Sequence, residues 1–311
     1  MIEISNVSKR FQHSNAVDGL TLQIATGELT VLIGTSGSGK STTLKMINRL
    51  IEPDSGSIRL AGADIRQQSP EVLRRHIGYA IQSVGLFPHW TVEQNIAAVP
   101  ALLKWPAARI RERVTELLEL LHLPAETFRQ RYPHQLSGGQ QQRVGVARAL
   151  AADPEVLLMD EPFGALDPVT RGSLQQELAR IQKLSGKTIV LVTHDIDEAL
   201  QLGQHIVLMD KGRIVQQGKP ESFLLQPAND FVRDFVGQSD AGVRLLGLTT
   251  VASRVQATAR ADGEPIRSDC TLREALSQFV SRQVDRLPVV NEQGQHAGAL
   301  LFCDLLGGRA S

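Results

Sequence analysis

The stretch 34–41 has the residue types and spacing to bind the phosphates of a nucleotide. It runs Gly-Thr-Ser-Gly-Ser-Gly-Lys-Ser and fits the pattern G-x-x-x-x-G-K-[ST]. Its three glycines let the backbone curl, so that successive N–H groups point at phosphate oxygens, and a helix start adds partial positive charge. Lys40 is placed to reach the β- and γ-phosphates, and the Ser41 hydroxyl can ligate Mg²⁺. A Gly/Ser linker that happens to contain lysine is the alternative.

Two carboxylates, Asp160 and Glu161, follow the apolar run 156–159. In open α/β sheets, ligands bind at the carboxyl ends of strands. One carboxylate can hold Mg²⁺, usually through water, and the next can polarise a water for attack on a γ-phosphate. Because Asp-Glu pairs are common, two solvated acids in a turn are the alternative.

A third candidate is the stretch 136–140, Leu-Ser-Gly-Gly-Gln. Ser137 and Gln140 have the spacing of a capping box, which predicts a helix start. Gly138 and Gly139 in the first turn each cost about 1 kcal/mol in helix propensity relative to alanine. Exposed backbone N–H groups that an anion can approach would compensate for that cost. Two anion sites in one domain suggest that they complete each other across a dimer.

The elements around these residues predict an α/β core. Apolar residues at 29–33 indicate a buried strand before the phosphate loop, and 41–50 indicates a helix after it. This strand–loop–helix context opposes the linker interpretation. Further strands are expected at 2–7, 20–24, 56–65, 77–82, 156–159, 188–192, 206–209 and 213–217. A helical block from about 91 to 152 interrupts them.

The composition is that of a soluble globular protein, with 42% hydrophobic and 21% charged residues among 311. Lys+Arg and Asp+Glu are 33 each, which gives no support for a nucleic-acid partner. Cys270 and Cys303 have no metal or redox spacing, so reduced thiols are expected. No apolar run approaches the roughly 18 residues of a membrane span, and the first residues show no secretory signal. We therefore expect a cytosolic protein that can dock on a membrane partner.

Together these motifs resemble the ATP-binding-cassette (ABC) ATPases over about residues 1–237. They occur in the order of that family: the phosphate loop, the Q-loop glutamine Gln82, the signature 136–140, the acidic strand 156–161, the D-loop Ala165-Leu166-Asp167 and the switch histidine His194. The resemblance implies a P-loop NTPase core with an antiparallel β subdomain and a helical insertion. It also implies ATP and Mg²⁺ as cofactors.

The resemblance further implies roles for single residues. Glu161 would be the general base, Gln82 would sense Mg²⁺ and the attacking water, and His194 would contact the γ-phosphate. Ser41, Gln82 and Asp160 would hold Mg²⁺. Phe11 would stack on adenine, for which a core aromatic at a strand end is the alternative. The expected ATP-binding residues are Phe11, Gly34, Thr35, Ser36, Gly37, Ser38, Gly39, Lys40, Ser41, Thr42, Ser137, Gly138, Gly139, Gln140 and Asp167.

A single cassette without a fused membrane span, and with a short helical insertion, favours an importer. The stretch 79–90 resembles the Q-loop region that receives a permease helix in importers. Leu86, Phe87 and Trp90 would suit such a socket, and ordinary packing between subdomains is the alternative. The amino-acid sequences of 34–50 and 160–171 are similar to those of the glycine betaine, carnitine and choline branch.

We therefore expect the ATPase subunit of an osmoprotectant importer at the cytoplasmic face of the inner or plasma membrane. Its expected partners are permease subunits, a periplasmic or extracellular solute-binding protein and a second copy of the chain, with no nucleic acid. An importer ATPase for another small solute, such as an amino acid or a polyamine, stays open. So does a soluble ATP-dependent switch protein.

A linker at 238–244 is expected to lead to a small α+β unit at 245–308. Residues 275–306 resemble a cystathionine-β-synthase (CBS) motif, which osmoprotectant importers of this branch carry after the cassette. Those relatives usually have two such motifs, and a single copy could pair across a dimer. Adenosine-binding motifs have Ser or Thr three residues before the Asp that matches Asp304. Leu301 stands there, which argues against nucleotide sensing.

Overall fold

The computed structural model describes residues 1–11, 14–81, 85–164 and 166–306, so the predictions for Gln82 and Ala165 lie outside the described residues. The chain divides into two compact units, Met1–Gly218 and Lys219–Ser311. The sequence placed a boundary after residue 237, whereas the contacts divide the chain after Gly218. The helix α11 (Ala241–Gly247) occupies much of the stretch expected to be a linker. The predicted domain extents stay predictions.

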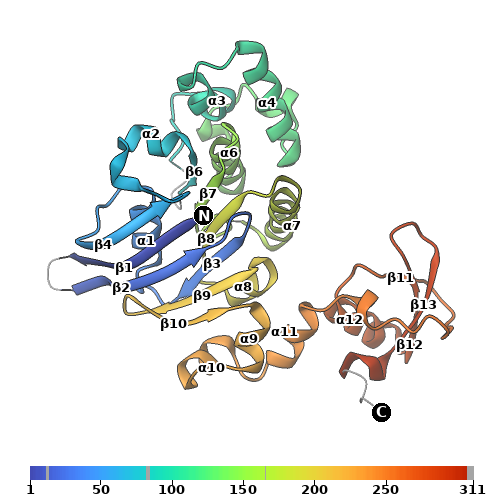
Figure 1. The fold of residues 1–311 in the computed structure, drawn as a ribbon. Helices are drawn as coiled ribbons and strands as arrows, with labels where there is room; N and C mark the ends of the chain where they lie inside the picture. The colour runs from blue at the N-terminus through green and yellow to red at the C-terminus, as the bar shows by residue number, and fades with distance from the viewer. Residues whose placement is uncertain (12–13, 82–84, 165, 307–311) are drawn as a thin grey trace. The chain divides into compact units, whose positions relative to one another are not determined.

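An antiparallel sheet forms the first layer of the first unit (Figure 1). Its strand order is β2-β1-β4-β5, with β1 (Ile2–Phe11), β2 (Ser14–Ile24), β4 (Ser55–Leu60) and β5 (Ala63–Asp64). Alternate residues of β1 and β2, such as Ile2, Ile4 and Leu22, are buried, which is the period expected of a sheet covered on one face. The β subdomain expected from the alternation is therefore present.

A six-stranded sheet, in the order β10-β9-β3-β8-β7-β6, forms the core. The strands are β3 (Leu29–Gly34), β6 (Ile77–Ala80), β7 (Val156–Asp160), β8 (Thr188–Val192), β9 (His205–Asp210) and β10 (Arg213–Gly218). All neighbours pair in parallel except β9 and β10, which form the predicted hairpin. Every residue of β3, β7 and β8 is buried, as in a parallel sheet covered on both faces. The order β3-β8-β7 brings the ends of the three central strands to one edge.

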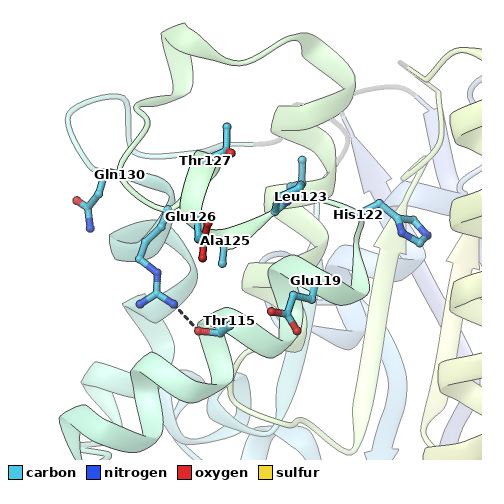
Figure 2. A pocket seen from close by; sticks show the side chains of 10 residues that line it. Thr115, Glu119, His122, Leu123, Ala125, Glu126, Thr127 and Gln130 are labelled. Carbon is cyan, nitrogen blue, oxygen red and sulfur yellow. Dashed lines mark hydrogen bonds between the residues drawn. The ribbon is translucent and has the colours of Figure 1, made fainter.

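Helices α3 (Val92–Leu102), α4 (Ala107–Leu120), α5 (Ala125–Phe128) and α6 (Gly138–Leu150) make up the predicted helical block, drawn in green in Figure 1. A cavity of about 730 Å³ lies between α4 and α5 (Figure 2). Thr115, Glu119, His122 and Glu126 are among its lining residues. No predicted phosphate-binding or catalytic residue lines this cavity.

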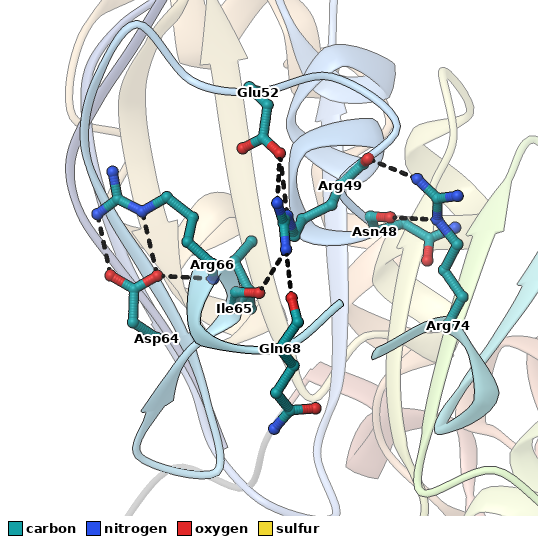
Figure 3. A network of polar contacts seen from close by, with 8 residues as sticks. All are labelled: Asn48, Arg49, Glu52, Asp64, Ile65, Arg66, Gln68 and Arg74. Carbon is teal, nitrogen blue, oxygen red and sulfur yellow. Dashed lines mark hydrogen bonds and ion pairs between the residues drawn. The ribbon is translucent and has the colours of Figure 1, made fainter. Parts of the chain in front are cut away.

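Helices α1 (Lys40–Ile47) and α2 (Pro70–Arg75) meet in the polar network of Figure 3. The helix expected at 41–50 ends at Ile47, because Arg49 leaves the helical conformation with a φ of 50°. Arg74 donates to the carbonyls of Asn48 at 3.1 Å and Arg49 at 2.6 Å. Arg49 itself donates to the carbonyls of Ile65 and Gln68. The Arg74 side chain of α2 thus binds two carbonyl groups just after the last residue of α1.

Helices α7 (Pro168–Ser185) and α8 (Ile196–Leu202) follow β7 and β8. Short 3₁₀ turns lie at Ile65–Gln67 and Pro133–Gln135 in this unit and at Val251–Ser253 in the second unit. No helix among the described residues is long and apolar enough to cross a bilayer.

The second unit begins with α9 (Pro220–Leu225), α10 (Asp230–Val236) and α11. Three strands then form one sheet with a helix against it: β11 (Ile266–Arg267), α12 (Leu272–Arg282), β12 (Arg286–Val290) and β13 (His296–Leu301), followed by a 3₁₀ turn at Phe302–Leu306. The capping box of Thr271 and Glu274 predicted from the sequence is present. The two-residue strand β11 was not predicted, because two residues show no period. Val251, Phe279 and Leu300 are among the residues of its separate core.

Candidate active site

The phosphate loop joins β3 to α1, as its sequence predicts. A Cβ on Gly34, whose φ is 147°, would collide with the carbonyl oxygen of Met209, and a Cβ on Gly39, at a φ of 101°, would collide with that of Ala16. These two positions therefore accept only glycine. Ser36 and Gly37 lie exposed at the tip of the loop. Thr35, whose Oγ1 donates to Asp210 at 3.0 Å, is exposed too.

Lys40 lies inside the curve of the loop and is 7% exposed. Its Nζ donates to the carbonyls of Gly34 at 2.9 Å and Thr35 at 2.8 Å, and to Ser38 Oγ at 3.2 Å. Burial lowers the pKa of the Lys40 ammonium, while the charges of Glu161 and Asp160 act in the opposite direction. The cation is thus held where the loop's N–H groups would surround a phosphate.

Ser41 and Asp160, two of the three residues expected to hold Mg²⁺, are in direct contact. Ser41 Oγ donates to Asp160 Oδ1 at 2.8 Å. Burial, with Asp160 only 4% exposed, raises the pKa of its carboxyl group, and the hydrogen bond from Ser41 opposes that shift. Hydroxyl and carboxylate oxygens suit Mg²⁺, which takes few protein ligands and completes its shell with phosphate and water. These two side chains therefore fit the ion.

Glu161 and His194, the two described members of the expected catalytic set, also lie together. His194 Nδ1 is 3.4 Å from Glu161 Oε1. Glu161 has a φ of 47°, a conformation that is uncommon for a residue other than glycine and is often found at functional sites. Its N–H donates to the carbonyl of Val192 at 2.9 Å, and its carbonyl accepts from Gln142 Nε2 at 3.1 Å. These contacts from β8 and α6 hold the backbone of Glu161 in place.

Gln142 was not among the residues expected at the site. It lies on α6 just after the signature stretch and is 4% exposed. Its type and position resemble those of any polar helix residue, so the sequence carries no signal for its contact with Glu161. A buried glutamine bound to the backbone of a predicted general base is a positioning group that only the fold shows.

The signature stretch forms the N-terminus of α6. Ser137 Oγ accepts from the N–H of Gln140 at 3.3 Å, and Gln140 Oε1 accepts from that of Ser137 at 2.9 Å, so the capping box is confirmed. Ser137 and Gly138 are exposed. A Cβ on Gly138 would meet nothing within 4 Å, whereas one on Gly139 would lie 3.0 Å from Leu166 Cδ2. The first turn therefore presents open backbone N–H groups.

Three further predicted ATP-binding residues, Asp167, Phe11 and Thr42, lie at the ends of elements. Asp167 caps α7, because its Oδ1 accepts from the N–H of Thr170 at 3.1 Å. Hydrogen bonds from the side chain and then from the backbone of Thr170 lower the pKa of the carboxyl group. Phe11 ends β1 with 43% of its surface exposed, so it is not packed in the core. Lys9 Nζ lies 5.6 Å from the centre of its ring. Thr42 lies half-buried in the first turn of α1.

Comparisons with known proteins agree with this arrangement. The family profile described as ABC transporter matches residues 17–164. The chain is 65% identical over 306 residues to the glycine betaine uptake system ATP-binding protein YehX of Escherichia coli (strain K12), covering 98% of this chain and 99% of that protein. It is 50% identical over 294 residues to the glycine betaine/carnitine/choline transport ATP-binding protein OpuCA of Bacillus subtilis (strain 168), covering 94% and 76%.

Solved structures give the same result for the fold. The ATP-binding cassette MJ0796, in a dimeric post-hydrolysis state bound to ADP and Pi, matches with a TM-score of 0.66 and 34% identity over 71% of this chain and 99% of that one. CbiO1 of Clostridium perfringens, part of the ABC transporter complex cbiONQ, matches with a TM-score of 0.66 and 28% identity over 77% and 96%. The P-loop NTPase core expected from the sequence is confirmed. The CBS-like identity of the second unit stays a prediction.

Proposed function

Because this chain belongs to the family of ABC transporter ATP-binding proteins, we propose that it hydrolyses ATP to drive uptake of a quaternary-amine osmoprotectant through a separate permease. Glycine betaine, choline and carnitine are the solutes meant. The observation that carries the proposal is similarity over nearly the whole chain to relatives named for these solutes. An importer for an amino acid or a polyamine is the alternative, because the solute contacts other subunits of such a system.

The residues of the first unit support a mechanism for hydrolysis. Lys40 and the N–H groups of the phosphate loop bind the β- and γ-phosphates of ATP. Glu161 accepts a proton from a water molecule, whose oxygen bonds to the γ-phosphorus as the bond to the β-phosphate oxygen breaks. His194, whose Nδ1 lies 3.4 Å from Glu161 Oε1, contacts the γ-phosphate and orients the Glu161 carboxylate. Ser41 and Asp160 would hold Mg²⁺, which would neutralise charge on the phosphates.

The exposed start of α6 supports a composite site shared by two chains. The backbone N–H groups of Ser137, Gly138 and Gly139 lie at this helix start. Apart from the two chain neighbours of Gly138 and the nearby backbone of its own helix, no atom of the described residues lies within 4 Å of the position that a Cβ on Gly138 would take. These N–H groups would bind the γ-phosphate of the ATP held by the phosphate loop of a second copy. The similar cassette MJ0796 is described as a dimer. A head-to-tail homodimer that closes on two ATP molecules follows from this pairing.

A groove along α3 supports a permease as the membrane partner. It has a volume of about 570 Å³ and is lined by Phe87, Trp90, Ala97, Ala101 and Leu102, among others. The rings of Phe87 and Trp90 lie 4.5 Å apart, so the pair forms one apolar wall. A short permease helix with apolar side chains would fit here, which would hold the chain at the cytoplasmic face of the membrane. A solute-binding protein on the opposite face completes the proposed system.

Uptake of radiolabelled glycine betaine tests this function. The chain and the permease that co-purifies with it from detergent extracts are expressed in cells without other betaine importers. We expect uptake with the wild-type chain and none with Glu161→Gln, with choline and carnitine as competitors. Competition by an amino acid or a polyamine alone would favour the alternative solute. Recovery of soluble partners only, with no multi-span protein, would favour a soluble switch.

A further inference from the structure

One side chain, Arg171, links the D-loop to the loop that carries His194. It lies in the first turn of α7, directly after the D-loop. Its Nη2 donates to the carbonyl of Leu166 at 3.3 Å, and its Nη1 lies 3.7 Å from Asp195 Oδ2. Each of these two charged side chains is about one-third exposed, so water screens their attraction only in part. The guanidinium thus bridges the segment after β7 and the segment after β8.

Asp195 is hydrogen-bonded to residues on either side of it. Its Oδ1 accepts from the N–H of Asp197 at 2.8 Å and from that of Glu198 at 3.2 Å, which caps α8. Its own N–H donates to Thr193 Oγ1 at 3.1 Å. His194 stands between these two anchored residues. A displacement of the Asp195 carboxylate is therefore expected to shift the backbone of His194 as well.

A second set of contacts, which is buried, also joins α7 and α8. Glu198 is 6% exposed and accepts from Thr193 Oγ1 at 2.6 Å and from Gln175 Nε2 at 3.1 Å. Gln175 lies one turn after Arg171 on α7, so both contacts leave the same face of that helix. Burial raises the pKa of Glu198, while Arg171 and the two hydrogen bonds oppose the shift. The loop 193–195, which carries His194, is thus held to α7 by the Arg171–Asp195 pair and by these buried hydrogen bonds.

Arg171 makes both contacts through its two terminal nitrogens, Nη2 and Nη1. Its Nε is buried and meets no hydrogen-bond acceptor among the residues that the structure describes.

We propose that Arg171 is a positioning residue that couples Leu166 of the D-loop to the loop of His194, so that docking of a second chain beside Leu166 holds His194 at Glu161. The inference rests on the proposed composite site. Arg171 touches neither nucleotide nor water in this scheme. It acts through Asp195 on the 3.4 Å contact between His194 and Glu161.

The test compares ATP hydrolysis by the full-length wild type, Arg171→Ala, Arg171→Lys and Asp195→Asn. Asparagine still caps a helix, so Asp195→Asn removes the charge and keeps the cap. A displacement of about 1 Å in a catalytic group can lower a rate about 100-fold. We expect a fall in kcat of that order in Arg171→Ala, an unchanged Kd for ATP and partial rescue in Arg171→Lys. Arg180→Ala, which removes an exposed α7 ion pair with Glu177, is the matched control and should hydrolyse ATP normally.

The double variant Arg171→Ala/Asp195→Asn separates coupling from mere loss of stability. If Arg171 and Asp195 act as one unit, the kcat of the double variant equals that of the less active single variant. Multiplied losses, or a rise in the Kd for ATP that matches the fall in kcat, would overturn the proposal. If the wild type hydrolyses ATP, Glu161→Gln does not, and Arg171→Ala is normal, this inference fails alone. If the wild type is inactive, the proposed function fails.

Discussion

The phosphate loop and the signature stretch are both glycine-rich starts of helices, yet their surroundings differ. Gly34 and Gly39 are pressed against carbonyl groups of the same chain, and Lys40 is bound within the loop. Gly138 has open space where a side chain would stand. The chain's own packing thus encloses the phosphate loop, and it leaves the signature stretch open at the surface. In the proposed dimer, the second chain would complete the open stretch.

The reason for glycine differs between the two regions as well. In the phosphate loop, positive φ angles and close backbone contacts exclude every other residue at Gly34 and Gly39. In α6, Gly138 has no such constraint, and glycine there weakens the helix by up to about 1 kcal/mol relative to alanine. Packing therefore explains Gly34 and Gly39, whereas packing within this chain does not explain Gly138, and the proposed phosphate contact gives a reason for it.

The largest expected effect comes from Glu161→Gln, which leaves both regions intact. Removal of a general base lowers a rate by roughly 10²- to 10⁴-fold, so steady-state hydrolysis should fall to near background. ATP should still bind and should now hold two chains together, as a dimer in analytical ultracentrifugation. Glu116→Gln, an exposed acid on α4, is the control and should behave as the wild type. Normal hydrolysis by Glu161→Gln would remove Glu161 from the mechanism.

The next effect is that of Gly138→Asp, which tests whether the open site binds phosphate. A carboxylate in the first turn is favourable for the helix, so the chain should fold with unchanged stability. Its repulsion of a γ-phosphate about 4 Å away amounts to several kcal/mol at an effective dielectric of 20. Hydrolysis should fall at least about tenfold, and the ATP-dependent dimer of Glu161→Gln should be lost in the double variant. A dimer that persists would mean that the signature stretch does not contact ATP.

Gly34→Ala is the counterpart in the closed region and should affect folding first. Its added Cβ meets the carbonyl of Met209, and its φ of 147° is strained for alanine. Such overpacking destabilises a fold by roughly 1–3 kcal/mol. Urea unfolding should show this loss, while Gly138→Ala should be as stable as the wild type or more so. Equal loss in both variants would contradict the contrast between the two regions.

The sequence predicts those parts of the site whose signals are local. The buried run before Asp160 identifies β7, and the spacing of Ser137 and Gln140 identifies the start of α6. Chain-distant contacts have no such signal. Val192 and Gln142 bind the backbone of Glu161, which has a φ of 47°, and Arg74 binds the carbonyls just after α1.

The same limit explains why Arg171 and Glu198 were not expected at the site. Each is an ordinary charged residue on an amphipathic helix as far as the sequence shows. Their partners, Asp195 and Gln175, come from the opposite helix, and only the order of β7 and β8 in the sheet makes α7 and α8 neighbours. Motif residues are visible from their types and spacing, whereas the residues that position them become visible only with the fold.

A smaller effect concerns the charge buried beside the phosphate loop. Burial raises the folded-state pKa of Asp160 above its ordinary value of 3.8, so the folded chain holds that proton more tightly than the unfolded chain does. The contribution of Asp160 to stability therefore falls as the pH rises from 3.8 through the raised pKa, and the penalty is complete at neutral pH. Asp160→Asn should unfold at higher urea than the wild type at pH 7. This difference should shrink as the pH approaches 3.8, and a constant difference would contradict the direction of the shift.

The smallest effect should come from Thr271→Ala in the second unit, outside both anion sites. Thr271 Oγ1 accepts from the N–H of Glu274 at 3.2 Å and caps α12. Loss of a cap destabilises a helix by about 1 kcal/mol, so protection of α12 amides in hydrogen exchange should fall. ATP hydrolysis should stay normal, and Thr271→Ser should restore the protection. A fall in hydrolysis would mean that the two anion sites of the first unit are not sufficient, and that a folded α12 contributes to closing the dimer.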